Sequence, residues 1–312
     1  MNIATVLSAT GFSRIKLFMA LSRTAHGVLD MATPALGALL WLGGLPPLPV
    51  ILVGFLTAFA GYTAVYALND VVDYRVDKEK VQRCGLPEAG NDLDALCARH
   101  PLAQGLLSLR DGILWTVAWG MIALLGAYAL NPVCALIFVL GCVAEAVYCL
   151  MLKVSYLRTA VSGAVKTAGG MAAVFAVTPD PSGPFLLFMF LWLFLWEIGG
   201  QNVPNDWADL QEDRDLQAET IPVRFGAELS ALIILSSLAA AVLLSLGLYW
   251  ATPAGLSSFY LLGALLTGIF FLIIPAYRLY TARTPRHASA LFNRASCYPV
   301  TMLVVILLSS MI

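Results

Sequence analysis

The stretch YALNDVVDYRVDKEK, residues 66–80, begins as apolar sequence of the kind found in membranes and then gathers acidic residues. Asn69, Asp70, Asp73 and Asp77 fall within nine positions. The chain around them has a mean hydropathy of +0.82 and only 12% charged residues, which excludes the soluble globular class. Ionisable residues at the edge of an apolar segment are costly, so these acids mark a place where function is expected.

Apolar runs recur along the full length of the 312 residues. A helix needs about 20 apolar residues to cross the hydrocarbon core of a bilayer. The sequence therefore predicts an all-α polytopic membrane protein, a bundle of nine transmembrane helices that forms a single domain over residues 1–312. We expect these helices near residues 20–43, 47–70, 110–130, 132–152, 158–178, 184–205, 228–250, 254–278 and 288–311.

The distribution of Lys and Arg predicts the orientation of the bundle, because short cytoplasmic loops carry an excess of these residues. The connections near GGLPPLP, ALNPV, TPDPSGP and YWATPAG contain none, whereas the N-terminal segment and the alternate connections all contain some. We therefore expect the N-terminus to be cytoplasmic, in an inner or plasma membrane. Two long loops, about residues 74–109 and 206–227, would cap the bundle on this side, and the C-terminus would lie opposite.

Composition also limits the partners of the chain. The net charge of −1 and the lack of a basic run predict no nucleic-acid partner, so membrane lipids are the expected surroundings. The six cysteines contain no CxxC pair, which favours reduced packing residues over disulfides or metal ligands. The first twenty residues lack the compact apolar core and cleavage site of a signal peptide, and no cleaved leader is expected.

The acids follow helical spacing at two places. Asn69, Asp73 and Asp77 are four residues apart, so a helix presents them as one stripe. The matching arrangement after the sixth predicted helix suggests an internal duplication. This second stripe has two overlapping choices, which are Asn202, Asp206, Asp209 and Asp213, or Asn205, Asp209 and Asp213.

Carboxylates packed this closely need counter-charge. Two of them 4 Å apart repel by roughly 4 kcal/mol at an effective dielectric constant of 20. One cluster at a membrane surface is as readily explained by solvation, but two matched clusters on one side favour Mg²⁺, which binds carboxylate and phosphate oxygens together. A Mg²⁺-bound diphosphate suits one chemistry: an allylic C–O bond ionises, and the apolar bundle shelters the carbocation and its isoprenoid tail.

Four segments resemble motifs of the UbiA superfamily of intramembrane prenyltransferases. NDVVDYRVD (residues 69–77) is similar to the first motif, NDxxDxxxD, and NDWADLQEDRDLQAETIPVRFG (205–226) to the second, a DxxxD pair with a tail toward TxPVRxG. RHPLAQGLLS (99–108) resembles the RPLxxGxxS segment with His100 inserted, and YCLMLK (148–153) resembles the Tyr/Lys motif. The resemblance spans most of the chain and includes the number of helices.

The resemblance implies Mg²⁺-dependent transfer of a prenyl group from an isoprenyl diphosphate to a lipophilic, typically aromatic, acceptor within the membrane. Products in the family are prenylated quinone precursors, chlorophyll, haem and ether lipids. The implied metal ligands are Asn69, Asp73, Asp77, Asp209 and Asp213, and the implied catalytic residues are Asp73, Asp77, Asp209, Asp213 and Lys153, whose ammonium approaches the diphosphate. The implied substrate-binding residues are Asn69, Asp70, Arg99, Tyr148, Asn202, Asn205, Asp206, Arg23 and Glu197.

The loop after the first motif departs from the family. About a dozen extra residues separate Asp77 from Arg99, where many members run directly through an Arg-Thr-xx-Arg-Pro pattern. Arg75 and Arg83 are therefore rivals of Arg99 for the diphosphate, and the acid-rich insert is expected to shape the choice of acceptor. The end of this loop, LDALCARHPLAQGLLSL (residues 93–109), is expected to form a short interfacial helix broken by its proline.

Ionisable residues also lie inside the predicted helices, at Asp30, Glu145, Lys166, Glu197 and Arg294. Each costs about 2.5–3.5 kcal/mol on membrane-insertion scales, so each needs a partner or a polar cavity. Structural pairing across helices and function are equally good explanations for most of them. Glu197 is the best functional candidate, because it lies shortly before the second acid motif and is placed to orient or deprotonate an acceptor.

Three other activities compete with prenyl transfer. A UbiA-type terpene cyclase would ionise the same diphosphate and quench the cation within the same molecule. A cation-coupled transporter would use the acids to bind translocated ions, but these acids gather at one face rather than at the membrane midplane. A CDP-alcohol phosphotransferase would need a DGxxAR signature, whereas Asp111 and Gly112 are followed by ILWTV.

Overall fold

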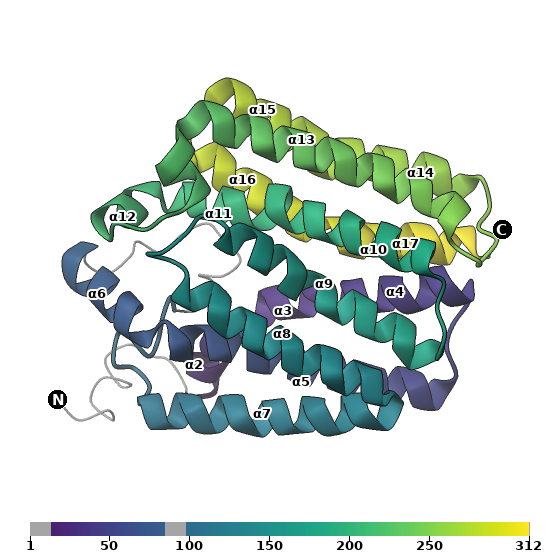
Figure 1. The fold of residues 1–312 in the computed structure, drawn as a ribbon, viewed down its shortest axis with the longest axis horizontal. Helices are drawn as coiled ribbons and strands as arrows, with labels where there is room; N and C mark the ends of the chain where they lie inside the picture. The colour runs from purple at the N-terminus through teal and green to yellow at the C-terminus, as the bar shows by residue number, and fades with distance from the viewer. Residues whose placement is uncertain (1–13, 85–97, 312) are drawn as a thin grey trace.

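The computed structural model describes residues 14–84 and 98–311, and both ranges are mostly α-helical. Within these ranges, nine helical spans are long and apolar enough to cross a membrane. They run along the length of an elongated bundle (Figure 1), which confirms the predicted all-α membrane fold. The spans are α3 (Thr24–Asp30) with α4 (Ala32–Leu42), α5 (Leu48–Val72), α7 (Leu109–Leu130), α8 (Pro132–Leu150), α9 (Arg158–Val177), α10 (Gly183–Trp196) through η2 (Glu197–Asn202) to α11 (Val203–Ala208), α13 (Ile221–Ala251), α14 (Phe259–Gly268) through η3 (Ile269–Ile273) to α15 (Ile274–Ala282), and α16 (Pro285–Ser296) with α17 (Tyr298–Ser309).

Two short helices that follow the acid motifs lie at the same end of the bundle. They are α6 (Tyr74–Cys84) and α12 (Leu210–Asp215), and Figure 1 places both at its left edge. Helix α17 runs to the opposite end, where the chain finishes. The helices that open the two segments predicted as caps therefore lie at one end of the bundle.

The outer surface of the bundle is apolar along whole helices. On α7, Leu125 is 64% exposed and Val117 56% exposed, although both lie in the middle of a span. Such a surface is compatible with lipid and not with water, because soluble proteins rarely expose contiguous apolar patches of this extent. The helical backbone satisfies its own hydrogen bonds, as a bilayer requires.

Each acid motif coincides with a break between two helices. Helix α5 ends at Val72, and α6 begins at Tyr74; α11 ends at Ala208, and α12 begins at Leu210. Hydrogen bonding nevertheless continues through both breaks. The Asp73 and Asp77 amides donate to the carbonyls four residues earlier at 2.9 and 2.8 Å, and those of Asp209 and Asp213 do so at 3.1 and 3.0 Å. The predicted acid stripes therefore survive the change of helix.

The expected interfacial helix at residues 93–109 is wrong where the structure describes it. Residues 98–108 form turns, and residues 93–97 lie outside the described ranges. The Pro101 carbonyl accepts the amides of Leu106 and Leu107 at 3.0 and 3.3 Å, with Gly105 at φ 71° in the turn. The leucines of this turn are buried against α2 (Arg14–Leu21) and α5, so protein packing replaces the expected membrane surface.

Helices α4 and α9 approach one another at glycines. A Cβ atom added to Gly37 would lie 2.3 Å from the Gly170 carbonyl oxygen, which is far inside van der Waals contact. Only a residue without a side chain permits this approach. It brings Asp30, at the end of α3, to the level of Lys166 on α9.

The helix that carries the second motif contains one wide turn. At η2 (Glu197–Asn202) the hydrogen bonds run from residue i+5 to residue i, as from the Val203 amide to the Ile198 carbonyl. Such π-turns are rare and are often found at functional sites. The turn carries Glu197, Gln201 and Asn202, all of them buried.

Candidate active site

One large cavity of about 1020 Å³ joins the two acid motifs to the apolar interior of the bundle. On α5, its lining extends from Val50, near one end of the span, to Asp73, just past the other. At 1.5 Å per residue, this is about 35 Å of helix. The acids at the polar end are Asp70, Asp73 and Asp77 from the first motif and Asp206, Asp209 and Asp213 from the second.

The first motif meets the loop that follows it. The Nδ1 atom of His100 lies 2.9 Å from an oxygen of Asp77 and 3.8 Å from an oxygen of Asp70. Ligand atoms of these three residues all lie within 4.8 Å of one another, a spacing suited to holding a cation. Arg23 reaches the same place from the start of α3, with its guanidinium 3.1 Å from the Asn69 amide oxygen and 3.5 Å from Asp70.

The second motif is held by three cationic side chains that precede it in the chain. Lys80, on α6, lies 3.3 Å from Asp209 and 2.6 Å from Glu212. Arg99 also binds Asp209 through its guanidinium. Arg158, at the start of α9, lies 3.6 Å from Asp206. The two halves of the chain are therefore joined by charge at the mouth of the cavity.

Burial and nearby cations shift the pKa values of neighbouring acids in opposite directions. Burial raises the pKa of Asp73 to about 6, with the nearby Asp77 adding to the shift. Burial likewise raises the pKa of Asp213 to about 6. Burial also acts to raise the pKa of Asp209, but Lys80 and Arg99 outweigh it and hold this pKa below its usual range. Asp209 thus stays ionised, whereas Asp73 and Asp213 titrate near neutral pH.

Lys153 is not brought into the cavity. Its ammonium lies 2.8 Å from Glu79, and its side chain is 37% exposed. Arg158, five residues later, lines the cavity and is almost fully buried, with its guanidinium carbon 4.1 Å from the centre of the Tyr148 ring. The sequence analysis missed Arg158, although it is the next basic residue after the Tyr/Lys motif. The predicted Tyr148 does line the cavity and accepts a hydrogen bond from Asn202 at 3.0 Å.

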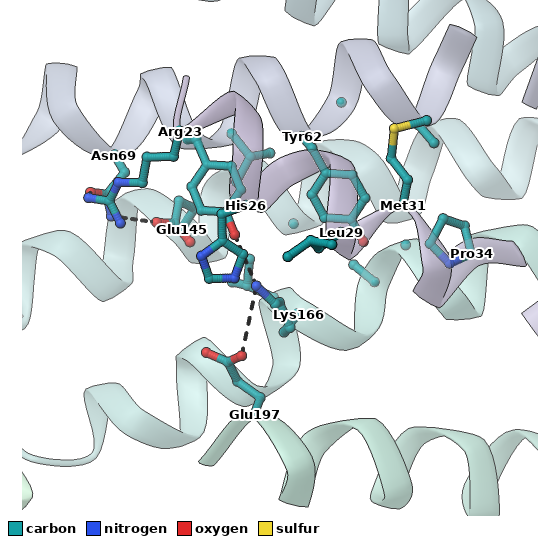
Figure 2. A pocket seen from close by; sticks show the side chains of 18 of the residues that line it. Arg23, His26, Leu29, Met31, Pro34, Tyr62, Asn69, Glu145, Lys166 and Glu197 are labelled. Carbon is teal, nitrogen blue, oxygen red and sulfur yellow. Dashed lines mark hydrogen bonds and ion pairs between the residues drawn. The ribbon is translucent and has the colours of Figure 1, made fainter. Parts of the chain in front are cut away.

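A polar network lies deeper in the cavity, below the acids. The Asn69 amide donates to Glu145 at 2.7 Å. Further along, Lys166 donates to Asp30 at 2.6 Å and lies 4.0 Å from Glu197 (Figure 2). The ionisable residues that the sequence placed inside helices therefore mostly pair with one another and border the cavity. Arg294 instead packs over the Phe270 ring, 5.4 Å from its centre.

Beyond this network the cavity wall is apolar. The remainder of the lining includes Leu45, Val50, Phe55, Phe138, Val177 and Leu303. The cavity thus has a charged end and a hydrocarbon-lined end, as a site for an amphiphilic molecule requires.

Nearly all the predicted site residues line this one cavity. Those from the first half of the chain are Arg23, Asn69, Asp70, Asp73, Asp77, Arg99 and Tyr148, and those from the second half are Glu197, Asn202, Asn205, Asp206, Asp209 and Asp213. Of the rivals of Arg99, Arg75 and Arg83 are both absent from the lining, and Arg83 instead pairs with Glu79 at 2.7 Å. Lys80 and His100, which the sequence analysis did not place in the site, also border it.

The sequence is similar to known proteins along most of its length. The profile of the UbiA prenyltransferase family matches residues 31–297. Digeranylgeranylglyceryl phosphate synthase of Thermococcus sibiricus is 26% identical over 221 residues, which cover 70% of this chain and 72% of the relative. Protoheme IX farnesyltransferase of Thioalkalivibrio sulfidiphilus is 26% identical over 290 residues, which cover 89% of this chain and 87% of the relative.

Solved structures share the fold. The apo structure of a UbiA homolog from Aeropyrum pernix K1 matches with a TM-score of 0.74 at 20% identity, over 91% of this chain and 98% of that one. A UbiA homolog from Archaeoglobus fulgidus bound to DMAPP and Mg²⁺ matches with a TM-score of 0.66 at 15% identity, over 93% and 98%. With a family match over most of its length, this chain belongs to the UbiA prenyltransferase family.

Proposed function

We propose that this protein transfers a prenyl group from an isoprenyl diphosphate to a lipophilic, aromatic acceptor inside the membrane, with Mg²⁺ as cofactor. The observation that carries the proposal is the division of a single cavity. Six aspartates and several cationic side chains meet at one end, and hydrocarbon side chains line the other. An isoprenyl diphosphate is divided in the same way, into a charged head and a long apolar tail.

The donor atoms at the polar end suit Mg²⁺. They are carboxylate and amide oxygens, the hard ligands that this ion prefers. Within the described part of the chain, one oxygen of Asp206 is buried without a hydrogen-bond partner. When bound there, Mg²⁺ would supply the charge that neutralises the departing diphosphate. A UbiA homolog of the same fold was solved with DMAPP and Mg²⁺. We assign the ligand role to Asn69, Asp73, Asp77, Asp209 and Asp213.

Cationic side chains would bind the phosphate oxygens. Arg23 and Arg158 border the cavity from the ends of two spans, and Lys80 and Arg99 come from the cap. Guanidinium groups match phosphate oxygens with paired hydrogen bonds. We give to Arg158 the phosphate contact that the motif resemblance assigns to Lys153, because Arg158 lies in the cavity and Lys153 pairs with Glu79 outside it.

The reaction itself would depend on positioning and exclusion of water. The allylic C–O bond breaks, and its electron pair leaves with the diphosphate. The carbocation is then sheltered by apolar walls and by the rings of Tyr66 and Tyr148, which border the cavity. An electron pair from the acceptor forms the new bond to the prenyl carbon, and the acceptor proton passes to a cavity carboxylate or to the diphosphate.

Pyrophosphate release from the purified protein in nanodiscs tests this proposal. Geranyl, farnesyl and geranylgeranyl diphosphate are supplied with Mg²⁺ or EDTA, with and without phenolic acceptors. Mg²⁺-dependent release that requires an acceptor is the expected result. Release that is equal without an acceptor would indicate a terpene cyclase or a hydrolase, and absence of diphosphate binding would return the transporter to consideration.

The relatives show that the acceptor varies within this family. One is named for a glyceryl phosphate product and the other for protoheme IX. These acceptors differ in charge and size, so the polar groups deep in the cavity are the place to look for the acceptor of this chain.

A further inference from the structure

The deep polar network is built from four different helices. Lys166 on α9 donates to Asp30 on α3 at 2.6 Å and to the Tyr66 hydroxyl on α5 at 3.0 Å. Tyr66 in turn donates to Asp30 at 2.5 Å. Glu197, on η2, accepts a hydrogen bond from Ser162 at 2.7 Å. Figure 2 shows Lys166 and Glu197 facing one another across the pocket.

Two polar groups in this network face each other without a hydrogen bond between them. An ammonium carries three hydrogens, and the hydrogen bonds to Asp30 and Tyr66 use two of those on Lys166. The second oxygen of Glu197, Oε2, is buried and has no hydrogen-bond partner among residues 14–84 and 98–311. The Lys166 nitrogen lies 4.0 Å from this oxygen, beyond hydrogen-bond length. Buried polar atoms are rarely left in this condition.

A single hydroxyl group would satisfy both. Its oxygen can accept from Lys166 while its hydrogen is donated to Glu197 Oε2. An ether or ketone oxygen lacks the hydrogen that Glu197 needs. A carboxylate or phosphate would add negative charge beside Asp30 and Glu197. Among the described residues, Lys166 lies in ion-pair range of both acids, and His26, 3.6 Å from Asp30, adds a counter-charge only when it is protonated. An unpaired charge is costly in such a buried place.

Building on the proposed function, we infer that Lys166 and Glu197 form the acceptor-binding site, and that the acceptor is an uncharged molecule with a hydroxyl group. The position of the site supports this. Tyr66 precedes Asp73 on α5 by seven residues, about 10 Å of helix. An acceptor held at this level by its hydroxyl can extend toward the acids while it remains within the same cavity.

Three probes of nearly equal shape test the inference by equilibrium dialysis against the full-length protein in nanodiscs. They are 2-naphthol, 2-methoxynaphthalene and 2-naphthoate, measured with Mg²⁺ and a non-hydrolysable geranylgeranyl diphosphate analogue present. We expect 2-naphthol to bind at least tenfold more tightly than either of the others. Equal binding of all three, or tighter binding of the carboxylate, would overturn the inference.

The variant Glu197→Gln should change the relative affinities for 2-naphthol and 2-naphthoate, which a purely structural role of Glu197 would leave unchanged. It keeps an acceptor oxygen for Ser162 and leaves the Lys166–Asp30 pair intact. We expect this variant to bind 2-naphthol at least fivefold more weakly than the wild type. It should bind 2-naphthoate more tightly, because a negative charge has been removed. The matched control is Asp111→Asn, whose carboxylate pairs with Arg14 at 3.1 Å outside the cavity lining; it should change the affinity for neither probe by more than twofold.

Binding of the diphosphate analogue separates this inference from the proposed function. If the wild-type protein binds the analogue with Mg²⁺ but binds the three naphthalenes equally, the assignment of the acceptor site is wrong, whereas the assignment of the prenyl-donor site is supported. If the analogue does not bind at all, the proposed function fails first. Thermal unfolding midpoints of both variants must stay near that of the wild type for the comparison to hold. If Glu197→Gln alters the fold, Ser162→Ala, which frees the other Glu197 oxygen, should still lower the selectivity for 2-naphthol.

Discussion

The Arg158 guanidinium contacts the face of Tyr148, with its central carbon 4.1 Å from the centre of the ring. Its outer nitrogen lies 3.6 Å from Asp206. Stacking of this kind fixes the direction of a guanidinium and leaves its outer nitrogens available. A motif lysine at position 153 could not do this, because a flexible ammonium at an exposed site is not held in one direction.

Arg158→Gln should weaken binding of geranylgeranyl diphosphate by about 10- to 100-fold, since a hydrogen bond to a charged group contributes about 1.5–3 kcal/mol. Lys153→Gln, the matched control whose side chain pairs with Glu79 and is absent from the cavity lining, should change it by less than about twofold. Titration calorimetry with Mg²⁺ present measures both. A larger loss in the Lys153 variant would restore the motif assignment.

Asp73→Asn and Asp209→Asn should each lower pyrophosphate release by at least about 100-fold, because each removes a charged metal ligand from the proposed site. The folded protein should persist, as size-exclusion profiles will show. Asp111→Asn serves as the control. Asp111 pairs with Arg14 at 3.1 Å near the same end of the bundle but outside the cavity lining, so its loss should leave turnover within about twofold. Near-normal turnover in both cavity variants would refute the metal assignment.

Mg²⁺ dependence should change with pH near 6. Asp73 and Asp213 have pKa values of about 6, and carboxylates bind metal in their deprotonated form. The deprotonated fraction of each group falls about tenfold between pH 7 and pH 5. The Mg²⁺ concentration for half-maximal activity should therefore rise at least about tenfold over this range, with activity restored by excess Mg²⁺. A flat profile between these pH values would contradict the assignment of these two acids as ligands.

The stability of the metal-free protein should increase as pH falls, whereas Mg²⁺ binding should weaken. The folded-state pKa of Asp73 is raised from the ordinary 3.8 to about 6, so the folded state binds a proton that the unfolded state does not bind in this window. Stability from this group is therefore lost as pH rises through 6 and gained as pH falls toward 4. In EDTA, Asp73→Asn should flatten the dependence of the unfolding midpoint on pH between 7 and 5. An unchanged slope in this variant would mean that other groups dominate.

Gly37→Ala should lower the thermal unfolding midpoint in detergent. The added Cβ would lie 2.3 Å from the Gly170 carbonyl oxygen, and a clash of this kind costs about 1–3 kcal/mol. Gly54→Ala is a matched control, because Gly54 also lies inside a helix and its added Cβ would meet no atom within 4 Å. The control should be neutral or slightly stabilising, since alanine favours helix. Equal midpoints in the two variants would show that α4 and α9 can separate without cost.

Much of this fold could be predicted from the sequence, because each feature was local. The spans follow from the length of apolar runs, and the stripes follow from four-residue spacing that helical hydrogen bonding preserves through the breaks at Asp73 and Asp209. The site residues that the motifs named lie together because both stripes emerge at the same end of the bundle. Spacing and span direction were sufficient for this.

What the sequence could not supply was contact between segments. Whether Lys153 or Arg158 turns inward depends on where α8 ends against α9, and only the packed structure places Glu79 beside Lys153. The turns at residues 98–108 replace a helix because buried leucines pack on α2 and α5, a tertiary effect on a short segment. Nothing in the local sequence distinguishes Lys80 from other charged loop residues, and only the packed structure places it beside Asp209.

The wide turn at Glu197–Asn202 sets the relative direction of the side chains on the two parts of one transmembrane helix, α10 before the turn and α11 after it. In an α-helix, side chains five residues apart point in clearly different directions. Winding from i to i+5 instead brings Glu197 and Asn202 closer to one line along the cavity wall. The turn thus sets the relative direction of Glu197, in the proposed acceptor site, and of the aspartates that follow it. Removing a single residue there would convert the wide turn into an ordinary α-helical turn, which winds by about 100° per residue, and would change which side chains this turn presents to the cavity between Glu197 and the aspartates.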